Sequence, residues 1–178
     1  MSGSRAAVLT VIILAMWGLK RHYASADVED LRWILGPTGK LVAFATGTPF
    51  EFERGAGYMS RPHLFVIEKS CAGLNFMIAA LGMTGFVLSR DGARGWGAAW
   101  TLGASVALSY AGAVLVNTVR ILVAIGLSSA NLASGWWTPA RIHRLEGIAV
   151  YFAGLMVLDL VARRFAEPGR PRGCGAPS

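Results

Sequence analysis

Four apolar runs, separated by polar segments, dominate the pattern along the chain and predict membrane-spanning helices. They cover residues 6–19, 71–88, 96–116 and 148–162. A span needs about 20 apolar residues, and the first run reaches that length if Lys20 and Arg21 extend their charges to the lipid headgroups. The third run continues past Arg120 to Leu127, so a fifth span is expected if residues 121–130 insert partly. The pattern predicts an all-α integral membrane bundle of about four to five transmembrane helices.

The most polar long stretch, residues 27–70, predicts an amphipathic segment outside the bundle. Acidic residues at 27–30 favour a helix start near the positive end of the helix dipole. The apolar face that follows is expected to break at Gly36-Pro37. A second amphipathic stretch, residues 41–45, would then lie along the membrane interface with Trp33 and Phe44 as anchors.

The end of this stretch predicts a small hairpin. Residues 50–53 (Phe-Glu-Phe-Glu) alternate with period two, and Gly55-Ala56-Gly57 supplies turn residues. Residues 64–67 are apolar and predict the return strand. An amphipathic helix followed by a hairpin is therefore expected just before Cys71.

Four segments follow from these patterns. Residues 1–26 form either a retained membrane anchor or a signal-like helix, because Ala24-Ser25-Ala26 fits a signal-peptidase site. The basic pair before that site favours the retained anchor. Residues 27–70 form the extracytoplasmic segment, residues 71–162 the transmembrane core, and residues 163–178 a basic cytoplasmic tail that we expect to be disordered from Phe165 onward.

Composition supports a membrane protein. The chain is 54% hydrophobic and only 15% charged, whereas soluble domains carry about 25% charged residues. The net charge of +7 is spread over loops and helix ends, with no basic helix interleaved with aromatic residues, so nucleic acid is not the predicted partner. Anionic membrane lipid fits this distribution better.

Charge density also predicts the orientation. With the amino terminus in the cytoplasm, more basic residues lie outside than inside in total, but the inside ones are denser in short loops and near span ends, which the orientation rule weights most. We therefore expect a multi-pass protein of the cell (cytoplasmic) membrane with residues 27–70 outside.

Three residues that could carry chemistry fall at the same membrane face, whichever face that is. Cys71 begins the second predicted span, Arg120 ends the third, and His143 precedes the fourth. Because neighbouring antiparallel helices alternate in direction, these three positions meet. In the orientation above, that face is extracytoplasmic.

Cys71 is the candidate nucleophile. It follows Lys69-Ser70 at an expected helix N-terminus, where the dipole and a cation both favour the thiolate. Gly73 leaves room for a backbone to approach. A cysteine in an apolar helix is more often an inert small hydrophobe, and that alternative stays open. No disulfide with Cys174 is expected, and Cys174 is predicted to have no role.

Arg120 and His143 are the candidate oxyanion binder and proton carrier. An arginine at membrane depth is a functional hypothesis by default, although it could instead extend to the interface. Asn117, one helical turn earlier, could orient it. His143 could exchange protons with a thiol and a leaving amine, or be a plain interfacial histidine, with Glu146 as an orienting carboxylate.

The remaining titratable residues carry weaker hypotheses. The histidines at 22 and 63 are weaker candidates, and Glu68 is a second orienting carboxylate. The sequence holds neither HExxH nor CxxC, so no metal or other cofactor is predicted. GxSxG and the phosphate-loop motif are also missing from it.

These residues together resemble the exosortase/archaeosortase family of membrane cysteine transpeptidases. The matching pieces are Cys71-Ala72-Gly73, residues 117–121 (Asn-Thr-Val-Arg-Ile) and residues 143–147 (His-Arg-Leu-Glu-Gly), and the similarity covers roughly residues 27–162. The compact length and residues 31–52 look most like the exosortase K branch. Many family members have about eight spans, and this chain has about half that number.

The resemblance implies a membrane cysteine protease or transpeptidase. Cys71, Arg120 and His143 would be catalytic, with Asn117, Gly73 and Glu146 binding or orienting the substrate. The implied partner is a secreted protein whose carboxy-terminal hydrophobic sorting tail is cleaved at the outer face through a thioester. The alternative is a non-enzymatic membrane scaffold or transporter subunit; another type of intramembrane protease is less favoured. The oligomeric state is not predicted.

Overall fold

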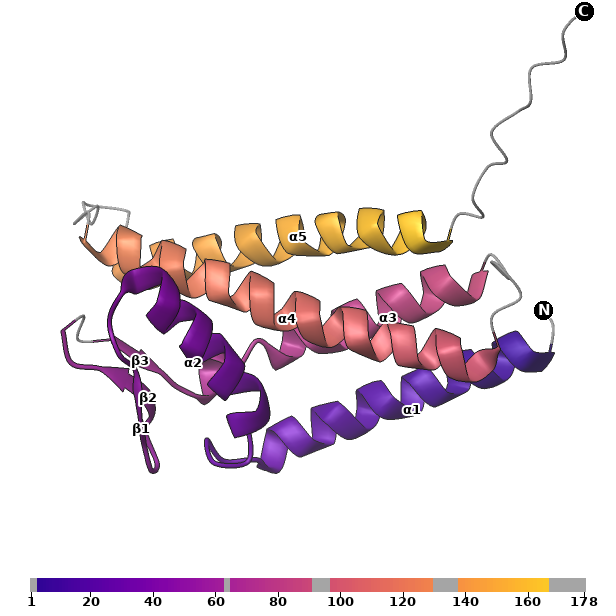
Figure 1. The fold of residues 1–178 in the computed structure, drawn as a ribbon, viewed down its shortest axis with the longest axis horizontal. Helices are drawn as coiled ribbons and strands as arrows, with labels where there is room; N and C mark the ends of the chain where they lie inside the picture. The colour runs from indigo at the N-terminus through magenta and orange to yellow at the C-terminus, as the bar shows by residue number, and fades with distance from the viewer. Residues whose placement is uncertain (1–2, 63–64, 91–96, 130–137, 167–178) are drawn as a thin grey trace, which may run out of the picture.

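The computed structural model describes residues 3–62, 65–90, 97–129 and 138–166. Four long helices run side by side: α1 (Gly3–Ser25), α3 (Leu74–Arg90), α4 (Ala98–Ser129) and α5 (Pro139–Ala166) (Figure 1). All four are long and apolar enough to cross a membrane, which makes the chain a membrane protein of the helical-bundle class. The helix α3 contacts the other three and is the most buried of them, whereas α1 is the most exposed.

The partial fifth span is wrong, because α4 continues without a break to Ser129. A helix of 32 residues is about 48 Å long, which exceeds the roughly 30 Å of a bilayer's hydrocarbon core. One end of α4 therefore extends beyond the apolar layer. Asn117 and Arg120 find partners on other elements, described below, so the helix does not have to turn back at these polar positions.

A single helix, α2 (Arg32–Thr46), replaces the two amphipathic stretches expected on either side of Gly36-Pro37. Proline has no N–H for the carbonyl four residues earlier, which here is that of Trp33. The Tyr110 hydroxyl donates to this freed carbonyl at 2.9 Å, and the Trp33 and Tyr110 rings stack. The side chain from α4 satisfies the group that Pro37 leaves open, so the helix continues.

Glycines in α2 serve packing rather than breaking the helix. A Cβ on Gly36 would lie 3.0 Å from the Tyr58 hydroxyl, and one on Gly39 would lie 3.3 Å from the Tyr58 ring. The two glycines therefore form the surface on which Tyr58 rests. Leu41 and Phe44 on the same helix are exposed, as expected for an interfacial helix.

The acidic residues at 27–30 do not begin the helix as predicted, because α2 begins at Arg32. The Asp30 carboxylate accepts the Asp27 N–H at 3.0 Å and closes a turn. The Glu29 carboxylate accepts the Gly55 N–H at 2.9 Å. These acids hold loop backbone in place instead of interacting with a helix dipole.

The predicted hairpin is a three-stranded antiparallel sheet in the order β1 (Glu51–Glu53), β2 (Gly57–Ser60), β3 (Phe65–Ile67). The return strand of β1 is β2, and the predicted partner β3 pairs with β2 instead. The sequence pattern misses β2 because the strand is short and begins at Gly57, a residue that the pattern assigns to the turn. In the structure Gly57 has a φ of 118°. Residues 63 and 64 lie outside the described part of the chain.

The segment before Cys71 and the bundle share one hydrophobic core. Leu31, Ile34, Leu35 and Ile67 are fully buried and cluster with residues of α3, α4 and α5. The sheet and α2 are thus fixed to the end of the bundle at which α3 begins. The prediction of a disordered tail concerns residues 165–178; of these, Phe165 and Ala166 belong to α5, and residues 167–178, with Cys174, lie outside the described residues.

Candidate functional site

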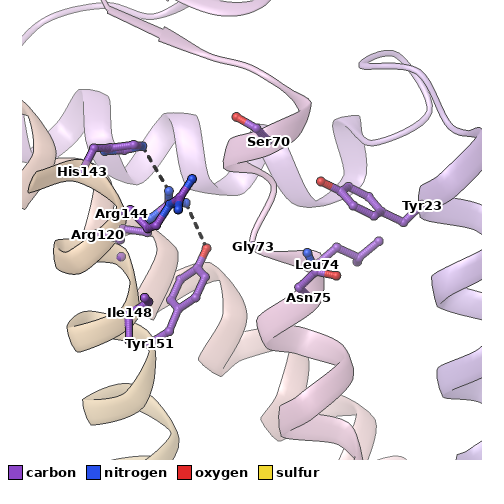
Figure 2. A pocket seen from close by; sticks show the side chains of 11 residues that line it. Tyr23, Ser70, Gly73, Leu74, Asn75, Arg120, His143, Arg144, Ile148 and Tyr151 are labelled. Atoms are coloured by element: carbon purple, nitrogen blue, oxygen red, sulfur yellow. Dashed lines mark hydrogen bonds between the residues drawn. The ribbon is translucent and has the colours of Figure 1, made fainter. Parts of the chain in front are cut away.

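A pocket of about 490 Å³ opens at the end of the bundle where α3 and α5 begin (Figure 2). Side chains from α1, α3, α4 and α5 and from the turn before α3 line it, and the sheet lies at the same end of the molecule (Figure 1). Its lining includes basic, aromatic and small residues. They are Tyr23, Ser70, Gly73, Leu74, Asn75, Arg120, His143, Arg144, Gly147, Ile148 and Tyr151.

Cys71 lies in a short 3-10 helix, η1 (Lys69–Cys71), and not on α3 as the sequence suggested. Its N–H donates to the Glu68 carbonyl at 2.9 Å. Gly73 then turns the chain into α3 with a φ of +67°, a conformation that glycine adopts without steric cost. Cys71 therefore precedes α3 by three residues instead of lying in its first turn.

Asn117 ties this turn to α4 and α5. It is fully buried; its amide nitrogen donates to the Cys71 carbonyl, and its amide oxygen accepts the Tyr151 hydroxyl at 3.0 Å. A Cβ on Gly73 would lie 3.0 Å from Asn117 Cβ and Cγ. A glycine at 73 therefore permits both the left-handed turn and the approach of Asn117.

Arg120 extends this set of contacts to His143. One guanidinium nitrogen donates to the Tyr151 hydroxyl at 3.2 Å, and the other lies 3.2 Å from His143 Nε2 (Figure 2). The guanidinium lies close to α5 because Gly147 has no side chain; a Cβ there would be 3.0 Å from Arg120 Nε. That Nε is buried and has no hydrogen-bond partner among the described residues.

His143 lies between Arg120 and Glu146, inside α5 rather than before it as predicted. Its Nδ1 is 3.5 Å from a carboxylate oxygen of Glu146, whose side chain is 5% exposed. Arg120 is always a donor, so the ring nitrogen that faces it, Nε2, accepts, and the proton of a neutral imidazole resides on Nδ1 toward Glu146. Glu146 approaches this nitrogen without a hydrogen bond: both of its carboxylate oxygens are buried and have no hydrogen-bond partner among the described residues.

The Cys71 thiol lies just behind the pocket wall. Its residue is 6% exposed, and the lining includes its neighbours Ser70 and Gly73 rather than Cys71 itself. The Ser70 hydroxyl is 3.8 Å from Sγ. Tyr23 and Tyr151 line the same pocket.

The structure brings Arg120 and His143 together, as their spacing suggested, and Asn117, Glu146 and Gly73 contact the same group. Cys71 joins it through its carbonyl, while its thiol stays outside the hydrogen-bonded set. The weaker candidate Glu68 accepts the Ser70 hydroxyl at 2.7 Å and does not reach His143. Among the described residues, no group of three His, Cys, Asp or Glu side chains is placed to hold a metal ion.

Tyr151, which contacts both Asn117 and Arg120, is a residue that sequence reasoning missed. It lies eight positions after His143, and positions four and eight apart share a helix face, so the spacing held a signal. Tyr23 on α1 is the second missed residue; its hydroxyl donates to the Lys69 carbonyl at 3.4 Å. Nothing in the local sequence distinguishes it from an interfacial tyrosine.

Two lysines connect the end of α1 to the site. The Lys20 ammonium donates to the Asn75 side chain at 3.0 Å. Lys69 donates to the Ala26 carbonyl at 2.7 Å. These two contacts join the end of α1 to the turn and to α3, so α1 forms one wall of the pocket.

Comparison of the chain with protein-family models, with curated proteins and with solved structures finds no match.

Proposed function

We propose that the protein is a membrane cysteine protease or transpeptidase that acts at this pocket, as the exosortase-like motifs imply. The observation that carries the proposal is the chain of contacts from Glu146 and His143 through Arg120 and Tyr151 to Asn117, which ends on the backbone of Cys71. A cation, an imidazole and a thiol-bearing turn, held together across three helices, are the groups that acyl transfer by a cysteine needs.

Cys71 is the nucleophile in this mechanism. Its sulfur attacks the scissile carbonyl, a carbon–sulfur bond forms, and the peptide C–N bond breaks. His143 takes the thiol proton and delivers it to the leaving amine. The thioester that remains is released by an amine in transpeptidation or by water in hydrolysis, and the two reactions differ only in that second nucleophile.

Arg120 is the oxyanion binder. Its planar guanidinium offers several donors in a fixed geometry, and in this structure one of them occupies the Nε2 lone pair of His143. Catalysis requires that lone pair for the thiol proton. The arriving carbonyl oxygen therefore draws the guanidinium away from His143, so that the substrate itself frees the base.

The substrate class follows from where the pocket lies. The pocket opens at the end of four helices with apolar, exposed outer surfaces, so a peptide bond next to a hydrophobic membrane segment can reach it. A secreted protein with a carboxy-terminal hydrophobic sorting tail has such a bond. With the amino terminus of the chain in the cytoplasm, the pocket faces the extracytoplasmic side of the cell membrane.

The second candidate function is a membrane scaffold or transporter subunit. One observation favours it: the Cys71 residue is only 6% exposed, as an inert core cysteine would be. In that case Asn117, Arg120 and Tyr151 would join helices and nothing more.

The test is a comparison of cells that produce the wild-type chain, Cys71→Ala or Cys174→Ala as their only copy. In the Cys71→Ala cells, a secreted protein with a carboxy-terminal hydrophobic tail should accumulate as its uncleaved precursor in the membrane fraction. Cys174→Ala, a change of the chain's other cysteine, should process the precursor as the wild type does. Unchanged processing in Cys71→Ala cells, with the variant present at normal amounts, would remove the protease proposal and leave the scaffold.

A further inference from the structure

The outer edge of strand β3 leads directly into the candidate site. The strand ends at Ile67, Glu68 continues it with extended backbone angles (φ −96°, ψ −175°), and η1 with Cys71 follows. The chain then passes Ser70 and Gly73 along the pocket (Figure 2). An extended peptide paired with this edge would therefore run alongside the chain that enters the pocket.

The register of the sheet shows which backbone groups face outward. A Cβ on Gly57 would overlap the Ile67 carbonyl oxygen, so that oxygen points toward β2. Opposed residues in an antiparallel pair alternate between hydrogen-bonded and non-hydrogen-bonded pairs. Because Ile67 opposes Tyr58 and Val66 opposes Met59, the Ile67 pair is hydrogen-bonded, and the N–H and C=O of Val66 point away from β2.

These outward groups have no hydrogen-bond partner among the described residues. The sheet order is β1-β2-β3, which makes β3 an edge strand. In the part of the chain that the structure describes, no strand pairs with its outer side, and neither Val66 nor Glu68 has a backbone N–H bonded there. An edge with unpaired backbone groups is a template for another extended chain.

We infer that the outer edge of β3, through Val66 and the Glu68 N–H, binds the substrate's backbone as an added strand and delivers the scissile bond to Cys71. This inference rests on the proposed protease function and names the conformation that the substrate must adopt. Backbone pairing does not depend on side-chain identity, so the edge would hold an extended peptide of varied sequence. The pocket would then select the residues next to the cleaved bond.

The test uses alkylation of Cys71 in native membranes containing the full-length chain, with N-acetyl-tetraalanyl chloromethyl ketone as the probe. The thiolate forms a sulfur–carbon bond to the probe's methylene group, and chloride leaves. Iodoacetamide has no peptide backbone that could pair with β3, so its labelling rate reports the reactivity of the thiol alone. Labelling rates at Cys71 are measured by mass spectrometry for the wild type, Val66→Pro and Val66→Ala.

Val66→Pro removes an outward N–H without removing a bond to β2, and proline is tolerated at such edge positions. We expect it to slow peptidyl labelling about tenfold, the effect of losing one hydrogen bond of ordinary strength, and to leave iodoacetamide labelling unchanged. Val66→Ala keeps the N–H, so the peptidyl probe should label it about tenfold faster than it labels Val66→Pro.

A second measurement needs no variant. Four probes, each N-methylated at a different alanine, are compared on the wild-type chain. Strand pairing predicts slower labelling at alternate alanines, because every second residue turns its N–H toward the partner. Equal labelling by all four probes, or a Val66→Pro variant that labels like the wild type, would overturn the inference while leaving the protease proposal intact. A Cys71 that reacts with neither reagent would instead reject the protease function itself.

Discussion

The two ends of the bundle satisfy their buried polar groups in different ways. At the end far from the pocket, Thr84, Ser105 and Ser109 are fully buried, and their hydroxyls donate to carbonyls three or four residues earlier in their own helices, at 2.8 to 3.0 Å. Thr84 adds a longer contact of 3.4 Å to the Ser105 carbonyl. Apart from this one contact between α3 and α4, these bonds are local and require no particular neighbour.

At the pocket end, the buried hydroxyls of Thr38 and Thr118 also bond within their own helices, but other hydrogen bonds there cross between elements. Asn117 joins α4 to the turn at Cys71 and, through Tyr151, to α5. Arg120 joins α4 to His143 and Tyr151 on α5. A bond between helices fixes their relative position, and its loss leaves groups unsatisfied on two elements. The difference indicates that the pocket end is built for fixed geometry, whereas the far end is held by packing of apolar and small residues.

The largest expected effect is that of Arg120→Lys on processing. Lysine keeps the charge but lacks the planar fork that reaches both Tyr151 and His143. The rate of precursor cleavage in isolated membranes should fall by about 10²- to 10³-fold, the effect of losing an oxyanion donor. Arg144→Lys, at an exposed position on the same pocket, should stay near the wild-type rate. Equal losses in both variants would contradict the assigned role.

Asn117→Leu and Ser105→Ala test the contrast between crossing and local bonds in terms of stability. The first change leaves the Cys71 carbonyl and the Tyr151 hydroxyl without their partner, and should lower the free energy of unfolding by about 2–3 kcal/mol. The second removes a local bond and improves helix propensity, so a change within about 0.5 kcal/mol is expected. Denaturation in mixed micelles measures both. A Ser105→Ala loss as large as that of Asn117→Leu would refute the contrast.

Gly73→Ala and Gly103→Ala should change stability in opposite directions. Alanine at 73 must adopt a positive φ and meet Asn117, which we expect to cost about 2 kcal/mol. Nothing lies within 4 Å of a Cβ at Gly103, and alanine in a helix interior stabilises by roughly 0.5–1 kcal/mol. The same unfolding measurement distinguishes the two signs, and a neutral Gly73→Ala would show that the turn can rearrange.

The smallest expected change in stability comes from loss of the hydrogen bond between Tyr110 on α4 and the Trp33 carbonyl on α2. Tyr110→Phe leaves the Trp33 carbonyl unpaired and should cost about 1 kcal/mol. In a Pro37→Ala background the alanine N–H can bond this carbonyl within the helix, so the same change should cost little. A double-mutant cycle measures the difference. Additive costs would show that the Tyr110 hydroxyl does not compensate for the proline.

The sequence predicted the helical membrane class and the meeting of Cys71, Arg120 and His143 at one end of the bundle. Apolar runs report spans directly, and the alternating direction of neighbouring helices brings positions 71, 120 and 143 to one end. Predictions from local sequence patterns were wrong where a residue distant in sequence determines whether a helix continues. Pro37 remains inside α2 because Tyr110, 73 positions away, satisfies the open carbonyl, and α4 passes Arg120 because α5 receives its donors.

The sequence did not predict several details of the candidate site for a similar reason. The placement of Cys71 in a 3-10 turn depends on Gly73 and on Asn117, which lies 46 positions later. Tyr151 gave a spacing signal relative to His143, but its contact with Arg120 depends on how α4 and α5 pack. The short strand β2 has too few residues to show a period, and the contact of its Tyr58 with Gly36 and Gly39 of α2 is not visible in the local sequence.

The central claim, that Cys71 carries an acyl group during the reaction, can be tested by intact-mass analysis of the purified chain under conditions where substrate is being processed. The account predicts an added mass on Cys71 that neutral hydroxylamine removes, since hydroxylamine cleaves thioesters, and that is lost in Cys71→Ala. An unmodified Cys71 in an actively processing wild-type sample, together with continued processing by Cys71→Ala, would contradict it.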